Sequence, residues 1–213
     1  MTRFVLVRHG ESQANQEKRF AGWLDTPLTG RGKEQAALTA EYLKTMHFDA
    51  AYGSDLVRAY ETGLAAIQYH PGLNLIPDTR LREIDGGRWE GILFEDLNAD
   101  WPEAYRLWRF EMHKSQCPEG ENVHDLQKRI CAELIRLAEK HPGETVLIAT
   151  HATPIRVMEL IFRGLPMEEI GNVSWVPNAS VTIVEYDEGK WNMTLRGYDG
   201  HLGALSTVLP NTI

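Results

Sequence analysis

The sequence predicts an α/β fold, a three-layer αβα sandwich with a mostly parallel sheet and an inserted helical cap. Short apolar runs typical of buried strands alternate with longer amphipathic runs typical of helices. This alternation is typical of βαβ units, whose helices cover both faces of a parallel sheet. Between Glu83 and Glu121 the alternation stops, and the sequence becomes helical and aromatic. That stretch is expected to form the cap.

The apolar runs predict six strands along the chain. They are expected near Arg3–Arg8, Asp49–Gly53, Asn74–Pro77, Thr145–Thr150, Ser180–Tyr186 and Asn192–Tyr198. The last two flank Asp187-Glu188-Gly189, and a glycine-containing connection of this length favours a hairpin.

Four helices are expected between the strands. They fall near Gly30–His47, Leu56–Gln68, Glu121–His141 and Thr153–Arg163. In the first of them, Ala36, Ala40, Leu43 and Met46 recur at helical spacing and form an apolar stripe. Since 213 residues are enough for one full hydrophobic core, we expect a single domain over residues 1–213, with the cap at about 84–121.

Charge and composition narrow the classes of partner. The net charge is −8 and no run of lysine or arginine occurs, so a nucleic-acid partner is not expected. No apolar run approaches the about 18 residues of a membrane span, and the first strand leaves no room for a signal peptide. The only two cysteines indicate no disulfide framework. We therefore expect a cytoplasmic protein with no membrane partner.

The first expected strand ends in Arg8-His9-Gly10. A neutral imidazole can attack phosphorus when one ring nitrogen is free and the other is held as a donor, and an adjacent guanidinium neutralises phosphate oxygens. Gly10 would give the backbone freedom to turn sharply past a ligand. The alternative interpretation of these three residues is a strand end with solvated polar side chains.

Three later segments add side chains of matching chemistry. Arg58 falls in the first turn of the second helix, where free N–H groups and the helix dipole favour an anion. Glu83 offers a carboxyl group in a loop, and His151 ends the fourth strand at the start of a helix. Strand ends of an open α/β sheet meet in one crevice. We therefore expect these three side chains to converge with the Arg8-His9 pair.

In these motifs the chain resembles the histidine phosphatase superfamily, also called the phosphoglycerate mutase-like family. The shared residues are Arg8-His9-Gly10-Glu11, Asn15, Leu28-Thr29, Gly32, Gln35-Ala36, Ser54-Asp55-Leu56, Arg58-Ala59, Glu61-Thr62, Leu81, Glu83, Gly87, Trp89-Glu90-Gly91, Thr150-His151 and Ile155-Arg156. They extend over nearly the whole chain. Four separated motifs in the right order make the match specific.

The resemblance implies a role for each matching residue. His9 would be the nucleophile that forms a phosphohistidine. Arg8, Arg58 and His151 would bind the phosphoryl oxygens, where charge is spread in the transition state. Asn15 would be a further phosphate ligand, although asparagine is also a common turn residue.

The family places its proton donor two residues after a leucine, and Leu81-Arg82-Glu83 fits this pattern. Glu83 would protonate the leaving oxygen and then activate the hydrolytic water. Asp85 and Glu90 are rival candidates in the same loop.

Recognition of the leaving group is expected in the cap. Its aromatic residues Trp101, Tyr105 and Trp108, together with Phe20 and Trp23, admit two interpretations. They pack the cap, or they line an apolar mouth for a ring-bearing or bulky phosphomonoester. Arg106 and Arg109 stand one helical turn apart and offer a looser clamp.

The mutase branch of the family follows its acid with Glu-Arg-His-Tyr-Gly, whereas this chain has Glu83-Ile84-Asp85-Gly86-Gly87. The chain more closely resembles the phosphatase branch, which includes broad-specificity and α-ribazole phosphatases. The expected activity is that of a histidine acid-type phosphatase, a metal-independent phosphomonoester hydrolase acting on a small phosphorylated substrate without a cofactor. Two alternatives stay open, a cofactor-dependent phosphoglycerate mutase and a non-catalytic phospholigand-binding protein. The sequence specifies neither the natural substrate nor the oligomeric state.

Overall fold

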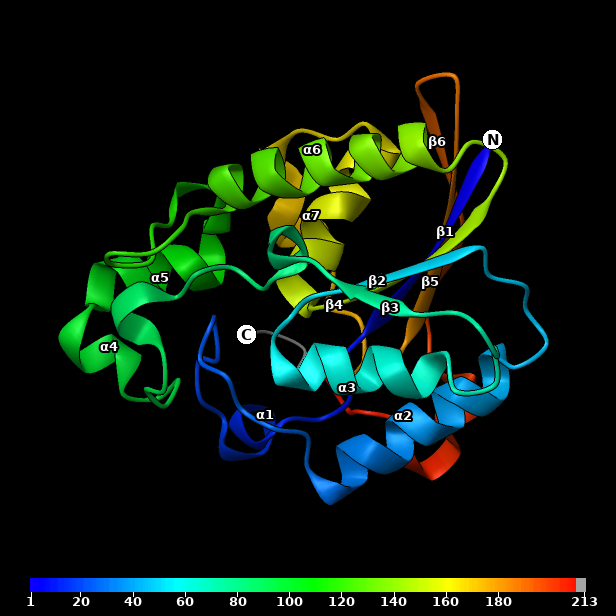
Figure 1. Ribbon diagram of the computed structural model, residues 1–213. Coiled ribbons are helices and arrows are strands. Elements are labelled where there is room, and N and C mark those ends of the chain that lie inside the picture. Colours follow the sequence, from blue (N-terminus) through cyan, green and yellow to red (C-terminus); the bar gives the residue numbers. More distant parts are fainter. Residues whose placement is uncertain (210–213) are drawn as a thin grey trace.

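The computed structural model describes residues 1–209 and is built on one six-stranded sheet with the strand order β3-β2-β4-β1-β5-β6 (Figure 1). The strands are β1 (Thr2–Arg8), β2 (Ala50–Gly53), β3 (Leu75–Pro77), β4 (Thr145–Thr150), β5 (Val181–Asp187) and β6 (Lys190–Tyr198). Strands β3, β2, β4 and β1 pair in parallel, and β5 is antiparallel to both β1 and β6. The predicted mostly parallel sheet is confirmed.

Helices cover both faces of this sheet, as predicted. On one face lie α2 (Gly30–Leu43) and α3 (Val57–Ala66), and on the other α6 (Val123–Lys140) and α7 (Ala152–Arg163) (Figure 1). Alternate side chains of β1 enter different cores because successive strand residues point to opposite faces. Phe4 and Leu6 pack in the core that contains α6 and α7, whereas Val5 and Val7 pack in the core beside α2 and α3.

The structure departs most from the expected helices in two places. The first long helix ends at Leu43, and Met46 packs against its core from the following turn, although the periodicity extended the helix to His47. A short helix, α1 (Gln13–Glu17), follows the Arg8-His9-Gly10 motif and was not expected, since five residues are too few to show periodicity. The predicted hairpin is present, with Glu188 and Gly189 at the positive φ values of 47° and 82° that tight hairpin turns require.

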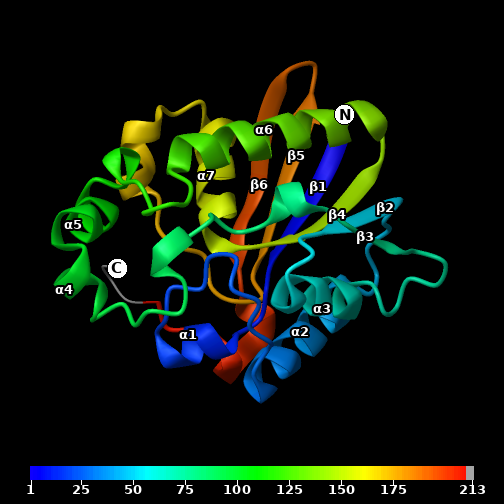
Figure 2. The same ribbon diagram turned by 60° about the vertical axis from the view of Figure 1, so that its left-hand side comes forward.

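Residues 84–121 contain α4 (Leu97–Asp100), α5 (Pro102–Phe110) and short 3₁₀ turns, and within the described chain no strand falls there. Figures 1 and 2 show α4 and α5 together at one side of the sheet, the side toward which β4 runs. The predicted helical insertion is therefore present. That the chain forms a single domain, with this insertion as a cap over the site, stays a prediction.

An aromatic cluster anchors this cap to the core. Phe20, from the loop after α1, contacts Trp89 and Trp108 edge to face, with ring centroids 5.4 and 5.2 Å apart. Trp89 also meets Tyr105 and Trp108 nearly perpendicularly. All four rings are buried and continuous with the core beneath α6 and α7.

Among residues 1–209, no helix is both long and apolar enough to cross a membrane.

Candidate active site

The site begins where β1 and β4 end side by side. The backbone N–H of His9 donates to the Thr150 carbonyl at 3.0 Å, which holds the two strand ends together. Gly10 follows, and a Cβ at this position would lie 2.3 Å from the Gly32 carbonyl oxygen of α2. The φ of Gly10 is not positive. Glycine is therefore required here for close backbone packing, and the expectation of a turn that needs glycine's freedom is wrong.

His9 is buried, and one contact defines its tautomer. Its Nδ1 lies 2.7 Å from the Gly10 carbonyl, an acceptor, so Nδ1 carries the proton. Burial, together with the charges of Arg58 and Arg8, lowers the His9 pKa well below its usual value. The ring is therefore neutral, and Nε2 keeps its lone pair. This is the state that a nucleophilic histidine needs.

His151 is a second buried imidazole, with its ring centroid 5.1 Å from that of His9. Its Nε2 contacts the Ser54 Oγ at 2.8 Å, and this Oγ accepts the Leu56 N–H at 3.3 Å. We assign the Ser54 hydroxyl proton to the contact with His151 Nε2, and this assignment puts the ring proton on Nδ1. Burial and the charge of Arg58 lower the His151 pKa well below its usual value. The ring is a neutral donor through Nδ1.

Arg8 and Arg58 bring two buried positive charges to these imidazoles. Arg8 donates from Nη1 to the Val176 carbonyl, and Arg58 donates from its two terminal nitrogens to the carbonyls of Leu24 and Gly22 at 2.9 and 2.7 Å. Burial lowers the pKa of Arg8 to about 10 and lowers that of Arg58 as well. Such burial of cations is costly unless an anion compensates it.

Three donors of this cluster have no acceptor among residues 1–209. They are Arg8 Nε, Arg58 Nε and His151 Nδ1, all buried. Buried donors are almost always paired in folded proteins. An oxyanion bound between the two arginines and His151 would supply the missing acceptors.

Glu83 lies in the loop after β3, half-buried. Its two carboxylate oxygens accept the N–H of Ile84 at 2.9 Å and the N–H of Thr153, in the first turn of α7, at 3.4 Å. The Glu83 charge acts on both Arg8 and Arg58, which it favours in their charged forms. The structure thus brings the carboxyl group to the cationic cluster.

The rival carboxyl groups are engaged with the backbone of their own loop. Glu90 Oε1 accepts the N–H groups of Trp23 and Gly86 at 2.6 and 3.0 Å, and burial raises the Glu90 pKa. Asp85 Oδ1 accepts the Gly87 N–H at 2.9 Å. Glu83 also accepts backbone N–H groups, but of the three carboxyl groups it is the one whose charge acts on both Arg8 and Arg58, and this favours Glu83 as the acid.

Asn15 is held by two donors to its amide oxygen. Its Oδ1 accepts the Ser12 N–H and one Asn178 Nδ2 proton, each at 3.2 Å. The Asn15 NH₂ group is the part left to donate to a ligand. Asn178 also donates to the His9 carbonyl at 3.1 Å, so one side chain joins the nucleophile to the expected phosphate ligand.

Sequence reasoning missed the supporting residues Ser54, Thr62 and Asn178. Thr62 Oγ1 accepts the Gly10 N–H at 3.1 Å. Ser54 and Thr62 lie within a matching motif, which was the available signal. Asn178 is 163 positions from Asn15, and no local pattern in one sequence connects the two.

The five aromatic residues expected to recognise the leaving group do not share one environment. Phe20 and Trp108 are buried in the aromatic cluster, which fits the packing interpretation. The Trp23 indole donates to the Glu83 carbonyl at 2.7 Å, and Trp101 lies half-buried with Arg88 over its ring. Of the five expected residues, Tyr105 lines a cavity.

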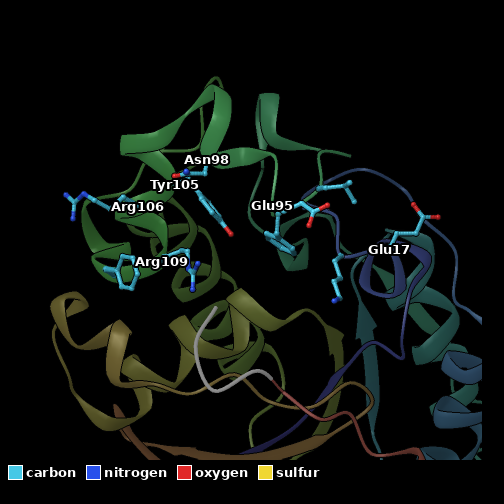
Figure 3. Close-up of a pocket in the computed structure, with 10 residues that line it drawn as sticks. Glu17, Glu95, Asn98, Tyr105, Arg106 and Arg109 are labelled. Atoms are coloured by element: carbon cyan, nitrogen blue, oxygen red, sulfur yellow. The ribbon is translucent and has the colours of Figure 1, made fainter.

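This cavity lies between the end of α1 and the cap helix α5 and has a volume of about 680 Å³ (Figure 3). We call it the cap cavity, and its walls include Glu17, Lys18, Glu95, Tyr105, Arg106 and Arg109. Arg106 is paired with Glu103 and Glu111, and Glu17 is paired with Arg19. Lys18 and Arg109 have no carboxylate partner within residues 1–209. The cavity therefore combines charged side chains with three aromatic rings, those of Phe94, Tyr105 and Phe110.

Comparison with known proteins identifies the family. Residues 4–199 match the model of the histidine phosphatase superfamily (branch 1). The chain belongs to this superfamily. It is 34% identical to phosphoserine phosphatase 1 of Hydrogenobacter thermophilus, over 95% of each chain. It is also 34% identical to the 2,3-bisphosphoglycerate-dependent phosphoglycerate mutase of Bartonella bacilliformis, over 78% of this chain and 84% of the mutase.

Among solved structures, Bacillus stearothermophilus YhfR superposes with a TM-score of 0.90 at 32% identity, covering 95% of this chain and all of that one. Members of the superfamily that resemble this chain thus include both phosphatases and mutases. The phosphatase relatives support phosphatase activity. The residue roles argued above stay proposals.

Proposed function

We propose that this protein hydrolyses small phosphomonoesters through a phosphohistidine on His9, with no catalytic metal ion. One observation carries the proposal: buried donors without protein acceptors surround a neutral imidazole nucleophile. The phosphoryl oxygens would accept from Arg8 Nε, Arg58 Nε and His151 Nδ1. Fixed donors of this kind stabilise charge that develops on the transferring group, and no metal need supply that charge.

In the first step, the lone pair of His9 Nε2 attacks phosphorus while the bond from phosphorus to the ester oxygen breaks. Glu83, protonated, gives its proton to the leaving oxygen, so the alcohol departs neutral. The Gly10 carbonyl, which accepts from Nδ1–H at 2.7 Å, stabilises the positive charge that the ring acquires. The product is phosphohistidine and a Glu83 carboxylate.

In the second step, the Glu83 carboxylate accepts a proton from water as the water oxygen attacks phosphorus. The bond from phosphorus to Nε2 breaks, and its electron pair returns to His9. Inorganic phosphate leaves, the imidazole is neutral again and Glu83 is protonated. Both groups are thereby restored for the next cycle.

The leaving group would occupy the cap cavity. Lys18, in its wall, follows the last residue of α1, and its N–H donates to the Asn15 carbonyl at 3.2 Å. Within the described chain, Lys18 and Arg109 lack carboxylate partners and Glu95 lacks a basic one. Two unpaired cations against one unpaired carboxylate leave the cavity positive, which favours a leaving group that carries a carboxylate. The relative that acts on phosphoserine is consistent with a substrate of this kind.

Trapping the intermediate tests the mechanism. The enzyme is mixed with labelled p-nitrophenyl phosphate and the reaction is rapidly quenched without acid. The label should then be found on His9 as an acid-labile, base-stable phosphate, located by mass mapping. His9→Ala should abolish both label and turnover, and turnover should survive exhaustive EDTA treatment. Label on a serine or cysteine, or activity lost in EDTA and restored by a divalent metal, would contradict the proposal.

A mutase stays the second candidate, because the unpartnered cations of the cap cavity also suit a phosphoglycerate. The two activities separate in one assay. If phosphate release from 3-phosphoglycerate is faster than its interconversion with 2-phosphoglycerate, the protein is a phosphatase. The reverse result makes it a mutase.

A further inference from the structure

Helix α6 directs one arginine onto the loop that carries Glu83. Arg129 Nη1 donates to the carbonyls of Arg80 and Arg82 at 2.9 and 3.0 Å, and Nη2 donates to the Glu83 carbonyl at 3.0 Å. Its Nε and Nη2 also donate to the two carboxylate oxygens of Glu121 at 3.0 and 2.7 Å. All five N–H donors of the guanidinium are used.

Glu121 extends this contact to the other side of Glu83. Its Oε2 accepts the Asp85 N–H at 3.0 Å, and its own N–H donates to the Asp85 carbonyl at 2.9 Å. The Arg129 and Glu121 side chains are only 16% and 19% exposed, so solvent screens their pairing less than that of a surface ion pair. Together they hold the backbone on both sides of Glu83.

The Glu83 loop depends on such contacts for its position. Residues 82–86 lie outside every helix and strand, so no backbone ladder fixes them. A general acid must stand within hydrogen-bond reach of the leaving oxygen, and a displacement of about 1 Å can cost 10²-fold in rate. The catalytic use of Glu83 therefore requires a loop held to a fraction of an ångström.

We propose that Arg129 is a positioning residue for acid–base catalysis, acting through the backbone of Glu83 and not on the substrate. The inference rests on the proposed role of Glu83. A planar guanidinium can serve three carbonyls and a carboxylate together, whereas the three donors of a lysine ammonium cannot reproduce that fork. Arg129→Lys should keep the charge and lose the geometry.

The readout is the dependence of kcat/KM on the leaving group. This constant reports formation of the phosphoenzyme, the step in which Glu83 gives up its proton. Arg129→Lys should lower kcat/KM for β-glycerophosphate about 10- to 100-fold, a part of the 10²–10⁴-fold that general acids contribute. For p-nitrophenyl phosphate, whose leaving group needs little protonation, the loss should be much smaller. If Arg129 only stabilised the fold, Arg129→Lys would lower kcat/KM for both substrates equally.

Arg136 provides a matched control on the same helix. It lies two turns beyond Arg129, pairs with the buried Glu133 and lies 3.6 Å from Asp78. In the described structure it makes no hydrogen bond to residues 82–86. Arg136→Lys should change both substrates alike. Should Arg129→Lys fold poorly by circular dichroism, Glu121→Gln is the second variant. It weakens the ion pair, keeps the side-chain volume and should show the same selective loss.

Glu83→Gln separates the two proposals. If Glu83→Gln shows a leaving-group-dependent loss and Arg129→Lys adds nothing in that background, the positioning role is supported. Equal losses on both substrates in Arg129→Lys and Glu121→Gln, while Glu83→Gln stays selective, would overturn the positioning role alone. If Glu83→Gln itself is unselective, the acid role of Glu83 is wrong and the inference fails with it.

Discussion

The proposed catalytic cluster (Arg8, His9, Arg58, Glu83 and His151) and the cap cavity hold their cations in two different ways. In the cluster, cations are buried, and their remaining contacts are carbonyls from distant segments such as Val176 and Gly22. In the cap cavity, Lys18, Arg106 and Arg109 are exposed, and the ion pairs are made within a few residues.

Under the proposed function, this difference would separate the chemical step from recognition of the leaving group. The buried charges are weakly screened and rigidly held, so they can stabilise a transition state. The exposed charges are screened and held by flexible side chains, so they can select a leaving group at small energetic cost. Changes in the first region should affect every ester, and changes in the second should affect only some.

The largest effect is expected at Glu83. Glu83→Gln should lower kcat/KM for an alkyl phosphate by about 10²–10⁴-fold, because the alkoxide then leaves without a proton. The effect on p-nitrophenyl phosphate should be far smaller. Glu90→Gln is the control, since Glu90 accepts the backbone N–H of Gly86 in its own loop and that of Trp23 in the loop after α1. If Glu90→Gln shows the selective loss instead, Glu90 is the acid.

A substitution of Trp108 tests whether the aromatic residues of the cap pack its core or contact the leaving group. Trp108 is 4% exposed and contacts Phe20 and Trp89, so Trp108→Ala should lower the free energy of unfolding by about 3–5 kcal/mol. Urea unfolding measures this loss. The kcat/KM of the folded fraction for p-nitrophenyl phosphate should be nearly unchanged. A stable Trp108→Ala variant with selective loss on bulky esters would restore the aromatic mouth.

Stability should depend on pH through the two buried histidines. Their folded pKa values are lowered, so below about pH 6.5 the unfolded state binds more protons than the folded state. The stability that they contribute is therefore full above pH 6.5 and falls as the pH drops toward the folded pKa values. Each histidine can contribute up to ~1.4 kcal/mol per pH unit. Urea unfolding between pH 7 and 5 measures the slope.

His9→Gln provides the comparison for that slope. It removes one titrating group, so stability should fall less steeply with acid than in the natural protein. An unchanged slope would show that His9 is not held neutral by burial.

The smallest effect is expected at Arg109. Arg109→Ala should lower kcat/KM for phosphoserine by about 1.5- to 5-fold, the range of one exposed charge contact, and should spare p-nitrophenyl phosphate. Arg106→Ala is the control, because Glu103 and Glu111 already engage that guanidinium. If both variants leave phosphoserine unaffected, the leaving group does not use this side of the cap cavity.

Local sequence predicted the catalytic cluster because each of its members follows a recognisable element. Arg8 and His9 end a buried strand, Arg58 lies in the first turn of a helix, and His151 precedes one. Parallel strands point their carboxyl ends in one direction, so predicting the sheet was enough to predict that these residues meet. Glu83 was harder to choose, because three carboxyl groups share its loop.

Local sequence could not predict in the same way which side chains of the cap line the cavity. Tyr105 and Trp108 belong to the same helix and the same residue class, yet Tyr105 lines the cavity and Trp108 does not. Sequence spacing places both on the helix, but what faces each of them depends on distant segments such as the Phe20 loop. Composition predicted aromatic character there, whereas the ion-pairing pattern of the cavity emerged only from the folded chain.

The sequence by itself predicted the three-layer architecture, because strand and helix periodicity are local properties. Its short motifs also indicated the five candidate catalytic residues, whose roles stay proposals. Only the tertiary structure decided the tautomers assigned to His9 and His151. It also decided the hydrogen bond of Asn178 to Asn15 and those of Arg129 to the Glu83 loop. Each of these depends on which polar groups from separate segments lie within about 3 Å, and a hydrogen bond is lost within a fraction of an ångström beyond that range.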